Sequence, residues 1–122
     1  GSTIRKTQET LYRHGGSAYG ITETALSMIV SELKEANPKV RIYGVLCEND
    51  PTNWWSRALQ NAGINYLAAP VLAVNSAKMK GEVVTVSDGA HWNRLGNKIF
   101  GEALALELSK DLRAHEPVQL SD

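Results

Sequence analysis

Hydrophobic residues recur at a spacing of three or four positions in two long segments, and this period predicts amphipathic helices. The segments are residues 21–36 and residues 93–114. The apolar positions of the first are Ile21, Ala25, Leu26, Ile29, Val30, Leu33 and Ala36, and those of the second are Leu95, Ile99, Phe100, Ala103, Leu104, Leu108 and Leu112. Another helix is predicted over residues 3–14, ending at Gly15-Gly16-Ser17.

Between the two long helices, apolar runs bounded by turn residues predict strands. Residues 40–46 read VRIYGVL, a nearly continuous apolar run of the kind found in strands buried on both faces of parallel sheets. Residues 64–69 predict a second strand that ends at Pro70, and residues 83–86 predict a short third one.

The segments that join these strands are predicted to be helices or loops. Residues 50–53 read DPTN, which can turn the chain and cap a helix over residues 54–62 that Gly63 closes. Residues 71–81 fit either a short helix or a loop. Strands that alternate with helices imply right-handed crossovers. The predicted fold class is therefore α/β, a parallel sheet flanked by helices.

Composition excludes several classes of protein. The 122 residues carry 13 Lys+Arg against 13 Asp+Glu, so there is no general electrostatic footprint for nucleic acid or anionic lipid. A hydrophobic share of 43% is too high for a disordered chain. The single cysteine, Cys47, excludes an intramolecular disulfide and a multi-thiolate zinc site. No stretch approaches the ~20 apolar residues of a membrane helix.

The segment most informative about function is residues 87–97, SDGAHWNRLGN, which follows the third predicted strand and enters the last helix. Ligands of open α/β sheets gather at such strand ends. Asp88 and His91 are three residues apart, so their side chains can meet in the loop. The carboxylate would fix the imidazole tautomer and leave the other ring nitrogen as a general base toward a serine hydroxyl. In the alternative interpretation, Asp88 caps the last helix and His91 is an ordinary surface residue.

The stretch DGAHWNRLGNKIFGEALALEL resembles the last conserved block of the SGNH/GDSL hydrolase superfamily, in which D-x-x-H or D-G-H-W-N precedes a glycine and a helix rich in Ala and Leu. Upstream, IVSELKEANPKVRIYGVL is similar to a helix and the fourth strand of that family, and AGINYLAAP to its next strand. The resemblance covers residues 21–112. It implies a flavodoxin-like three-layer sandwich, incomplete in this chain.

The function that the resemblance implies is a Ser-His-Asp esterase or O-acyltransferase acting on small-molecule or carbohydrate esters. His91 would be the general base, Asp88 its orienting partner, and Trp92 would shape the substrate site. The HWN variant is similar to members that add or remove O-acetyl groups on cell-surface polysaccharides, which implies a periplasmic or secreted protein. Three histidines without clustered spacing predict no metal site, and no cofactor is predicted.

The chain departs from the family in its nucleophile, because it has no Gly-Asp-Ser motif. Ser17, in the stretch GGSAYG, is either a substitute nucleophile or part of a glycine-rich turn. Asn49, in the stretch CEND, is either an oxyanion-hole residue or part of a turn.

The predicted organisation is an expression-vector remnant at residues 1–2, a helix with a Gly-rich turn at 3–20, an α/β domain resembling the C-terminal half of an SGNH hydrolase at 21–114, and a tail at 115–122. The family's earlier strands and its serine would then lie upstream. Unpaired strand edges predict that the chain pairs with a missing N-terminal half or with another protein chain. Alone, it is expected to be inactive. The competing hypothesis is a non-catalytic recognition or assembly module, such as a soluble domain of a membrane protein.

The remaining candidates have plainer interpretations. Cys47, at a strand end, is predicted to be a small buried residue. His14 and His115 lie near helix ends and are predicted to cap the helix or to lie on the surface. The pair Trp54-Trp55 could line a carbohydrate or acyl pocket, but packing is predicted for at least one of the two.

Overall fold

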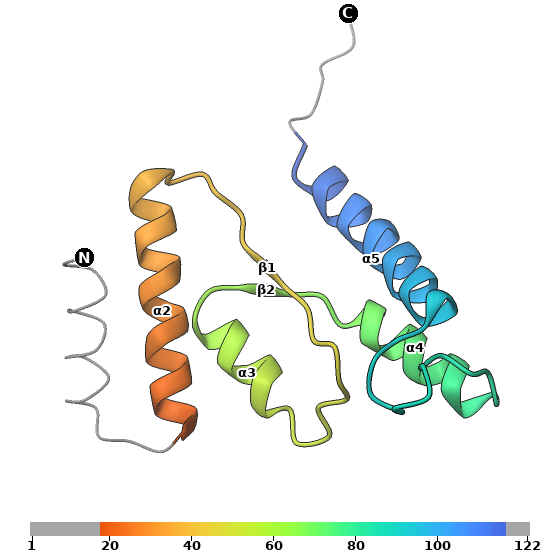
Figure 1. Ribbon diagram of the computed structural model, residues 1–122. Helices are drawn as coiled ribbons and strands as arrows, with labels where there is room; N and C mark the ends of the chain where they lie inside the picture. The colour runs from red at the N-terminus through yellow and green to blue at the C-terminus, as the bar shows by residue number, and fades with distance from the viewer. Residues whose placement is uncertain (1–17, 117–122) are drawn as a thin grey trace, which may run out of the picture. The chain divides into compact units, whose positions relative to one another are not determined.

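The structure is a computed structural model that describes residues 18–116 (Figure 1). Its elements are, in chain order, α2 (Ala18–Ala36), β1 (Tyr43–Gly44), α3 (Trp54–Asn61), β2 (Asn65–Tyr66), α4 (Ala69–Met79) and α5 (Arg94–Ala114). The described chain divides into two compact units. The sheet unit comprises residues 18–46 and 50–66, and the α4–α5 unit comprises residues 47–49 and 67–116.

Helix α2 confirms the helix predicted over residues 21–36, although it begins earlier, at Ala18. Its side chain Val30 is buried in the core of the sheet unit, and Leu26 packs against that core. The helix ends where Asn37 donates its backbone N–H to the Leu33 carbonyl at 2.9 Å. The next residue is Pro38, which disfavours a helical Asn37. The helix predicted over residues 3–14 lies outside the described residues.

The sheet unit contains a short parallel sheet. Strands β1 and β2 pair in parallel, with Tyr43 opposite Asn65 and Gly44 opposite Tyr66. The predicted parallel pairing is confirmed, but the ladder is much shorter than the apolar runs suggested. Gly44 permits a close approach, since a Cβ there would lie 3.0 Å from the Ile64 side chain.

Helix α3 connects the two strands, as predicted. Its start is held by Asp50, whose carboxylate oxygens accept from the backbone N–H groups of Trp54 at 3.1 Å and of Ser56 at 3.0 Å. These bonds, led by that from Ser56, lower the pKa of Asp50. Asn53 occupies the N-cap position in the left-handed region and makes no side-chain cap bond, so Asp50 caps the helix in its place. Gly63, with φ of +86°, follows the helix end.

Residues 71–81, which fit either a short helix or a loop by sequence, lie mostly in helix α4. Pro70 lies in the first turn of this helix instead of merely ending a strand, because an N–H at that position would have no partner within the helix. The backbone N–H of Ala69 donates to Glu107 Oε2 at 2.9 Å, which ties α5 to the start of α4. Helix α5 confirms the predicted last helix.

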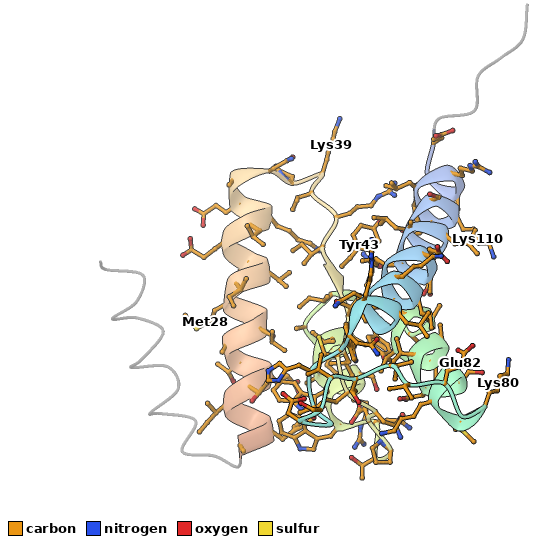
Figure 2. The ribbon with its side chains drawn as sticks, turned by 45° about the vertical axis from the view of Figure 1, so that its right-hand side comes forward. Met28, Lys39, Tyr43, Lys80, Glu82 and Lys110 are labelled. Carbon is orange, nitrogen blue, oxygen red and sulfur yellow. The ribbon has the colours of Figure 1, made fainter. Side chains whose placement is uncertain are left out.

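The core of the α4–α5 unit is formed by Val74, Ala77 and Val84, against which Trp92, Ile99 and Phe100 pack. Charged side chains project from the exposed surface of this unit, among them Lys80, Glu82 and Lys110 (Figure 2).

The prediction of a strand over residues 83–86 is wrong. The segment forms only an isolated antiparallel bridge, between Thr85 and Trp92. The chain reverses direction between these two residues, so Thr85 pairs with the segment that follows it in sequence and not with a strand of the sheet. Across residues 18–116 the architecture is therefore helices with one two-stranded parallel sheet. None of the helices described there combines the length and apolar composition needed to cross a bilayer.

Candidate Asp-His site

The loop between α4 and α5 is folded back on itself by backbone hydrogen bonds. The N–H of Val86 donates to the His91 carbonyl at 2.9 Å, and the N–H of Gly89 donates to the Val86 carbonyl at 2.9 Å. Gly89 has φ of +70°, a left-handed conformation that glycine adopts without steric cost. This tight turn places Asp88 and His91 next to each other.

The side chains of Asp88 and His91 are hydrogen-bonded through Oδ2 and Nδ1. Asp88 Oδ1 also accepts from the backbone N–H groups of Ala90 at 2.9 Å and of His91 at 3.0 Å. These bonds, first of all that from the His91 side chain, lower the pKa of Asp88. An ionised carboxylate only accepts hydrogen bonds, so His91 Nδ1 is the donor and Nε2 of the neutral ring is left without a proton. The predicted meeting of the two side chains is confirmed.

His91 presents its ring to solvent. Its side chain is 84% exposed, while that of Asp88 is 45% exposed. A neutral imidazole with an unprotonated, accessible Nε2 can accept a proton from a bound hydroxyl. The pair therefore has the local geometry of a general base with its orienting carboxylate.

Asn93, rather than Asp88, caps helix α5. Its Oδ1 accepts from the backbone N–H of Gly96 at 2.9 Å, so the alternative in which Asp88 caps the helix is wrong. The Asn93 amide also donates to the carbonyl of Val83 at 2.7 Å, and to that of Thr85 at 3.4 Å. The apolar spacing of α5 does not predict this cap, whereas the preference for Asn just before a helix is a sequence signal that does.

Gly96 brings the first turn of α5 against the segment before the loop. It is buried, and a Cβ there would overlap the Val84 carbonyl oxygen and lie 2.9 Å from Trp92 Cβ. The close packing against Val84 and Trp92 therefore explains why a glycine, with no Cβ, occupies this position of the HWNRLG stretch.

Trp92 is half-buried beside the Asp-His pair. Its ring lies 4.6 Å from that of Phe100, at an interplanar angle of 36°. This contact anchors the end of the loop in the core of the α4–α5 unit. A contact between Trp92 and substrate stays a prediction.

The other predicted site residues have mixed outcomes. Ser17 and His14 lie outside the described residues. Cys47 is exposed, so the prediction that it is buried is wrong, because residues 47 and 48 form an exposed bend after β1. Asn49 follows this bend and is also exposed, and its oxyanion role stays a prediction.

The predictions for His115 and for tryptophan packing are confirmed. His115 is the C-cap residue of α5, and its Nδ1 donates to the Asp111 carbonyl at 2.8 Å. Trp54 is half-buried and packs edge-to-face against Tyr19, with 5.1 Å between ring centroids, and against Trp55, at 4.6 Å. Trp55 remains 47% exposed, and whether it lines a pocket stays a prediction.

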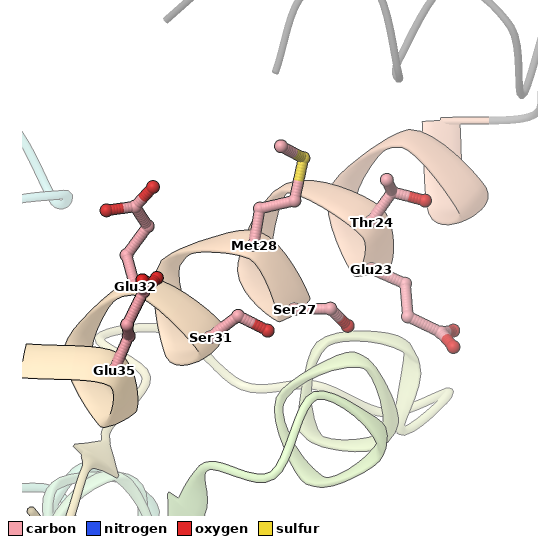
Figure 3. Close-up of a pocket in the computed structure, with 7 residues that line it drawn as sticks. All are labelled: Glu23, Thr24, Ser27, Met28, Ser31, Glu32 and Glu35. Carbon is pink, nitrogen blue, oxygen red and sulfur yellow. The ribbon is translucent and has the colours of Figure 1, made fainter. Parts of the chain in front are cut away.

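A hollow of about 330 Å³ runs along α2 in the sheet unit (Figure 3). Its described lining residues come from this one helix and include none of the predicted site residues: Glu23, Thr24, Ser27, Met28, Ser31, Glu32 and Glu35. Within residues 18–116, no three His, Cys, Asp or Glu side chains gather into a group that could hold a metal ion.

Comparisons of the chain with protein-family models, with curated proteins and with solved structures found no match. The geometry of the Asp88–His91 pair and the sequence pattern around it are therefore the features that bear on function.

Proposed function

We propose that this chain supplies the Asp-His pair of an SGNH-type serine esterase or O-acyltransferase, with acetylated carbohydrates among its ester substrates. The observation that carries the proposal is the hydrogen bond between Asp88 and His91 in a loop that leaves the imidazole 84% exposed. A histidine oriented by a carboxylate and open to a hydroxyl is what activation of a serine requires.

In the proposed reaction, His91 Nε2 takes the proton of a serine hydroxyl as the serine oxygen attacks the ester carbonyl. Asp88 stabilises the imidazolium that forms. His91 then gives the proton to the departing alcohol oxygen, leaving an acyl-serine. Water in an esterase, or an acceptor hydroxyl in a transferase, then attacks the acyl carbon while His91 Nε2 takes its proton. His91 returns that proton to the serine oxygen as the acyl group leaves, which restores the serine and the neutral imidazole.

The proposed serine comes from a Gly-Asp-Ser segment upstream of this sequence or from another chain, with Ser17 as the alternative. On the same hypothesis, β1 and β2 belong to a larger parallel sheet of the three-layer SGNH sandwich. The shortness of their ladder, with only two residues in each strand, supports a sheet that other strands complete.

The alternative function, a recognition or assembly module, is favoured by exposed apolar side chains of the α4–α5 unit. Leu72 is 58% exposed, Val83 73% and Leu106 60%. Exposed apolar area of this kind marks interaction surfaces when it is contiguous. This alternative predicts self-association or a stable complex, which light scattering of the purified chain measures. It also predicts that the complete protein does not hydrolyse p-nitrophenyl acetate, and this second measurement separates it from the catalytic proposal.

The test of the catalytic proposal is hydrolysis of p-nitrophenyl acetate by the product of the complete reading frame. His91→Ala is expected to lower kcat/KM by about 10²- to 10⁴-fold, because the general base is lost. His115→Ala is the matched control, since it removes another exposed histidine that bonds within its own turn, and it should leave kcat/KM unchanged. The 122-residue chain alone is expected to be inactive.

Two outcomes would change this picture. Hydrolysis that is equal in the wild type and in His91→Ala contradicts the proposal. Hydrolysis by the 122-residue chain alone that His91→Ala abolishes would instead make Ser17 the nucleophile. Ser17→Ala and labelling with a fluorophosphonate would then identify it.

A further inference from the structure

We propose that Asn93 is the positioning residue of the Asp88–His91 pair, because its side-chain amide clamps the segment before the loop to the start of α5. The consequence for catalysis rests on the proposed function above. The effect of Asn93 on which nitrogen of His91 carries the proton does not depend on that function.

The Asn93 side chain joins backbone groups from both sides of the loop. Its Oδ1 accepts from Gly96 N–H at 2.9 Å inside α5, and its Nδ2 donates to the Val83 carbonyl at 2.7 Å. The backbone N–H of Asn93 donates to the Val84 carbonyl at 2.9 Å, which reinforces the same closure. Asp88 and His91 lie between the two points that Asn93 connects.

The pair needs such a clamp because both partners are exposed. An exposed hydrogen-bonded pair gains little free energy and loses side-chain entropy, so it persists when the backbone already holds the two residues in place. The hydrogen bonds from the N–H groups of Ala90 and His91 to Asp88 require the loop to be folded. Backbone bonds also close the loop, from Val86 N–H to the His91 carbonyl and from Asn93 N–H to the Val84 carbonyl. The Asn93 amide extends this closure to the Val83 carbonyl, which neither of these backbone bonds reaches.

A simple helix cap would not need the amide nitrogen. Capping uses only Oδ1, whereas the Nδ2 bonds go to the segment before the loop rather than to α5. Serine at this position can still cap the helix but has no amide to donate to Val83. Asn93→Ser therefore separates the clamp from the cap.

The experiment measures the tautomer of the neutral His91 ring in the ¹⁵N-labelled chain, from two-bond ¹H–¹⁵N correlations at alkaline pH. In the wild type we expect the Nδ1–H form to dominate, because Asp88 accepts that proton. In Asn93→Ser we expect a marked shift toward the Nε2–H form, with the helical circular dichroism retained.

Asn97→Ser is the matched control. The Asn97 amide also donates to backbone oxygens, those of Asn93 at 3.1 Å and Trp92 at 3.4 Å, but not to the segment before the loop. This variant should keep the wild-type tautomer. A wild-type tautomer in Asn93→Ser, or an equal shift in both variants, overturns the proposal.

A second variant keeps the proposal testable if Asn93→Ser unfolds. Asn93→Asp retains an oxygen that accepts from Gly96 N–H and adds a favourable negative charge at the helix start, yet it cannot donate to Val83 when ionised. It should shift the tautomer as Asn93→Ser does, and an unchanged tautomer overturns the inference.

The two proposals fail in distinguishable ways. If the complete protein hydrolyses no ester but Asn93→Ser shifts the His91 tautomer, the proposed function fails and this inference stands. If His91→Ala abolishes hydrolysis and Asn93→Ser leaves the tautomer unchanged, only this inference fails. When both hold, Asn93→Ser should lower kcat more than it changes KM, since the residue touches the loop rather than the substrate.

Discussion

The two ends of α5 use the same pair of residue types in different ways. Asp88 and His91 precede the helix, and Asp111 and His115 lie at its end. At the start, the imidazole bonds to the carboxylate. At the end, Nδ1 of His115 bonds instead to the Asp111 backbone carbonyl at 2.8 Å, while the Asp111 carboxylate oxygen lies 3.8 Å from it.

The two histidines bond to different partners because different backbone groups lack a hydrogen-bond partner at the two ends of the helix. The last turn of a helix presents carbonyl groups without partners, and a nearby histidine satisfies one of them without any distant contact. The loop before α5 instead turns N–H groups toward Asp88, which orients its carboxylate for His91. A general base thus requires a particular backbone around the pair, in addition to an Asp and a His close in sequence.

The largest effect is expected on catalysis, where substitutions test whether the Asp88–His91 pair is catalytic and the Asp111–His115 pair is not. If the proposed esterase activity holds, Asp88→Asn should lower kcat on the order of 10⁴-fold, because an amide in place of the carboxylate favours the wrong imidazole tautomer. Steady-state hydrolysis of p-nitrophenyl acetate by the complete protein measures this. Asp111→Asn should leave kcat unchanged, and an equal loss in both variants would erase the distinction between the two ends.

A smaller effect is expected on the free energy of unfolding when either of two glycines of α5 is replaced by alanine. Gly96→Ala should lower the free energy of unfolding by about 1–3 kcal/mol, because the new methyl group would overlap the Val84 carbonyl. Gly101 has no atom near its missing Cβ, so Gly101→Ala should instead raise stability by about 0.5–1 kcal/mol. Urea unfolding followed by circular dichroism measures both. A Gly96→Ala variant as stable as Gly101→Ala would show that the start of α5 does not press on Val84.

The smallest effect concerns the pH dependence of the Asp88 pair. The His91 side chain and two backbone N–H groups lower the pKa of Asp88 in the folded chain. The stability that these bonds contribute is therefore present above the ordinary carboxyl pKa and is lost as pH falls through the folded value. Because Asp88 is exposed, this contribution is small.

Carbon-13 NMR of the Asp88 carboxyl group measures this titration directly. His91→Ala should raise the pKa of Asp88, since it removes the largest cause of the lowering, but the bonds from backbone N–H groups should keep part of it. His115→Ala should leave the Asp88 titration unchanged. A titration that does not respond to His91→Ala would show that the two side chains do not pair in solution.

Local patterns predicted the helices better than the strands. The apolar stripes of α2 and α5 repeat over several turns, so each helix could be placed from residue spacing alone. The run at residues 40–46 has the composition of a long buried strand, but only Tyr43 and Gly44 are paired. A strand is defined by hydrogen bonds to another segment, and composition does not tell where that segment lies.

By itself the sequence determined that Asp88 and His91 are close enough to meet, and that a helix begins just after them. It did not determine that Asn93 would cap this helix and clamp the loop, nor that Gly96 would lie against Val84. Those features depend on residues 83–85 returning to the start of α5, a contact that exists only once α4 and α5 have packed together. Side-chain spacing along the chain is local, whereas the partner of a backbone carbonyl is chosen by the tertiary fold.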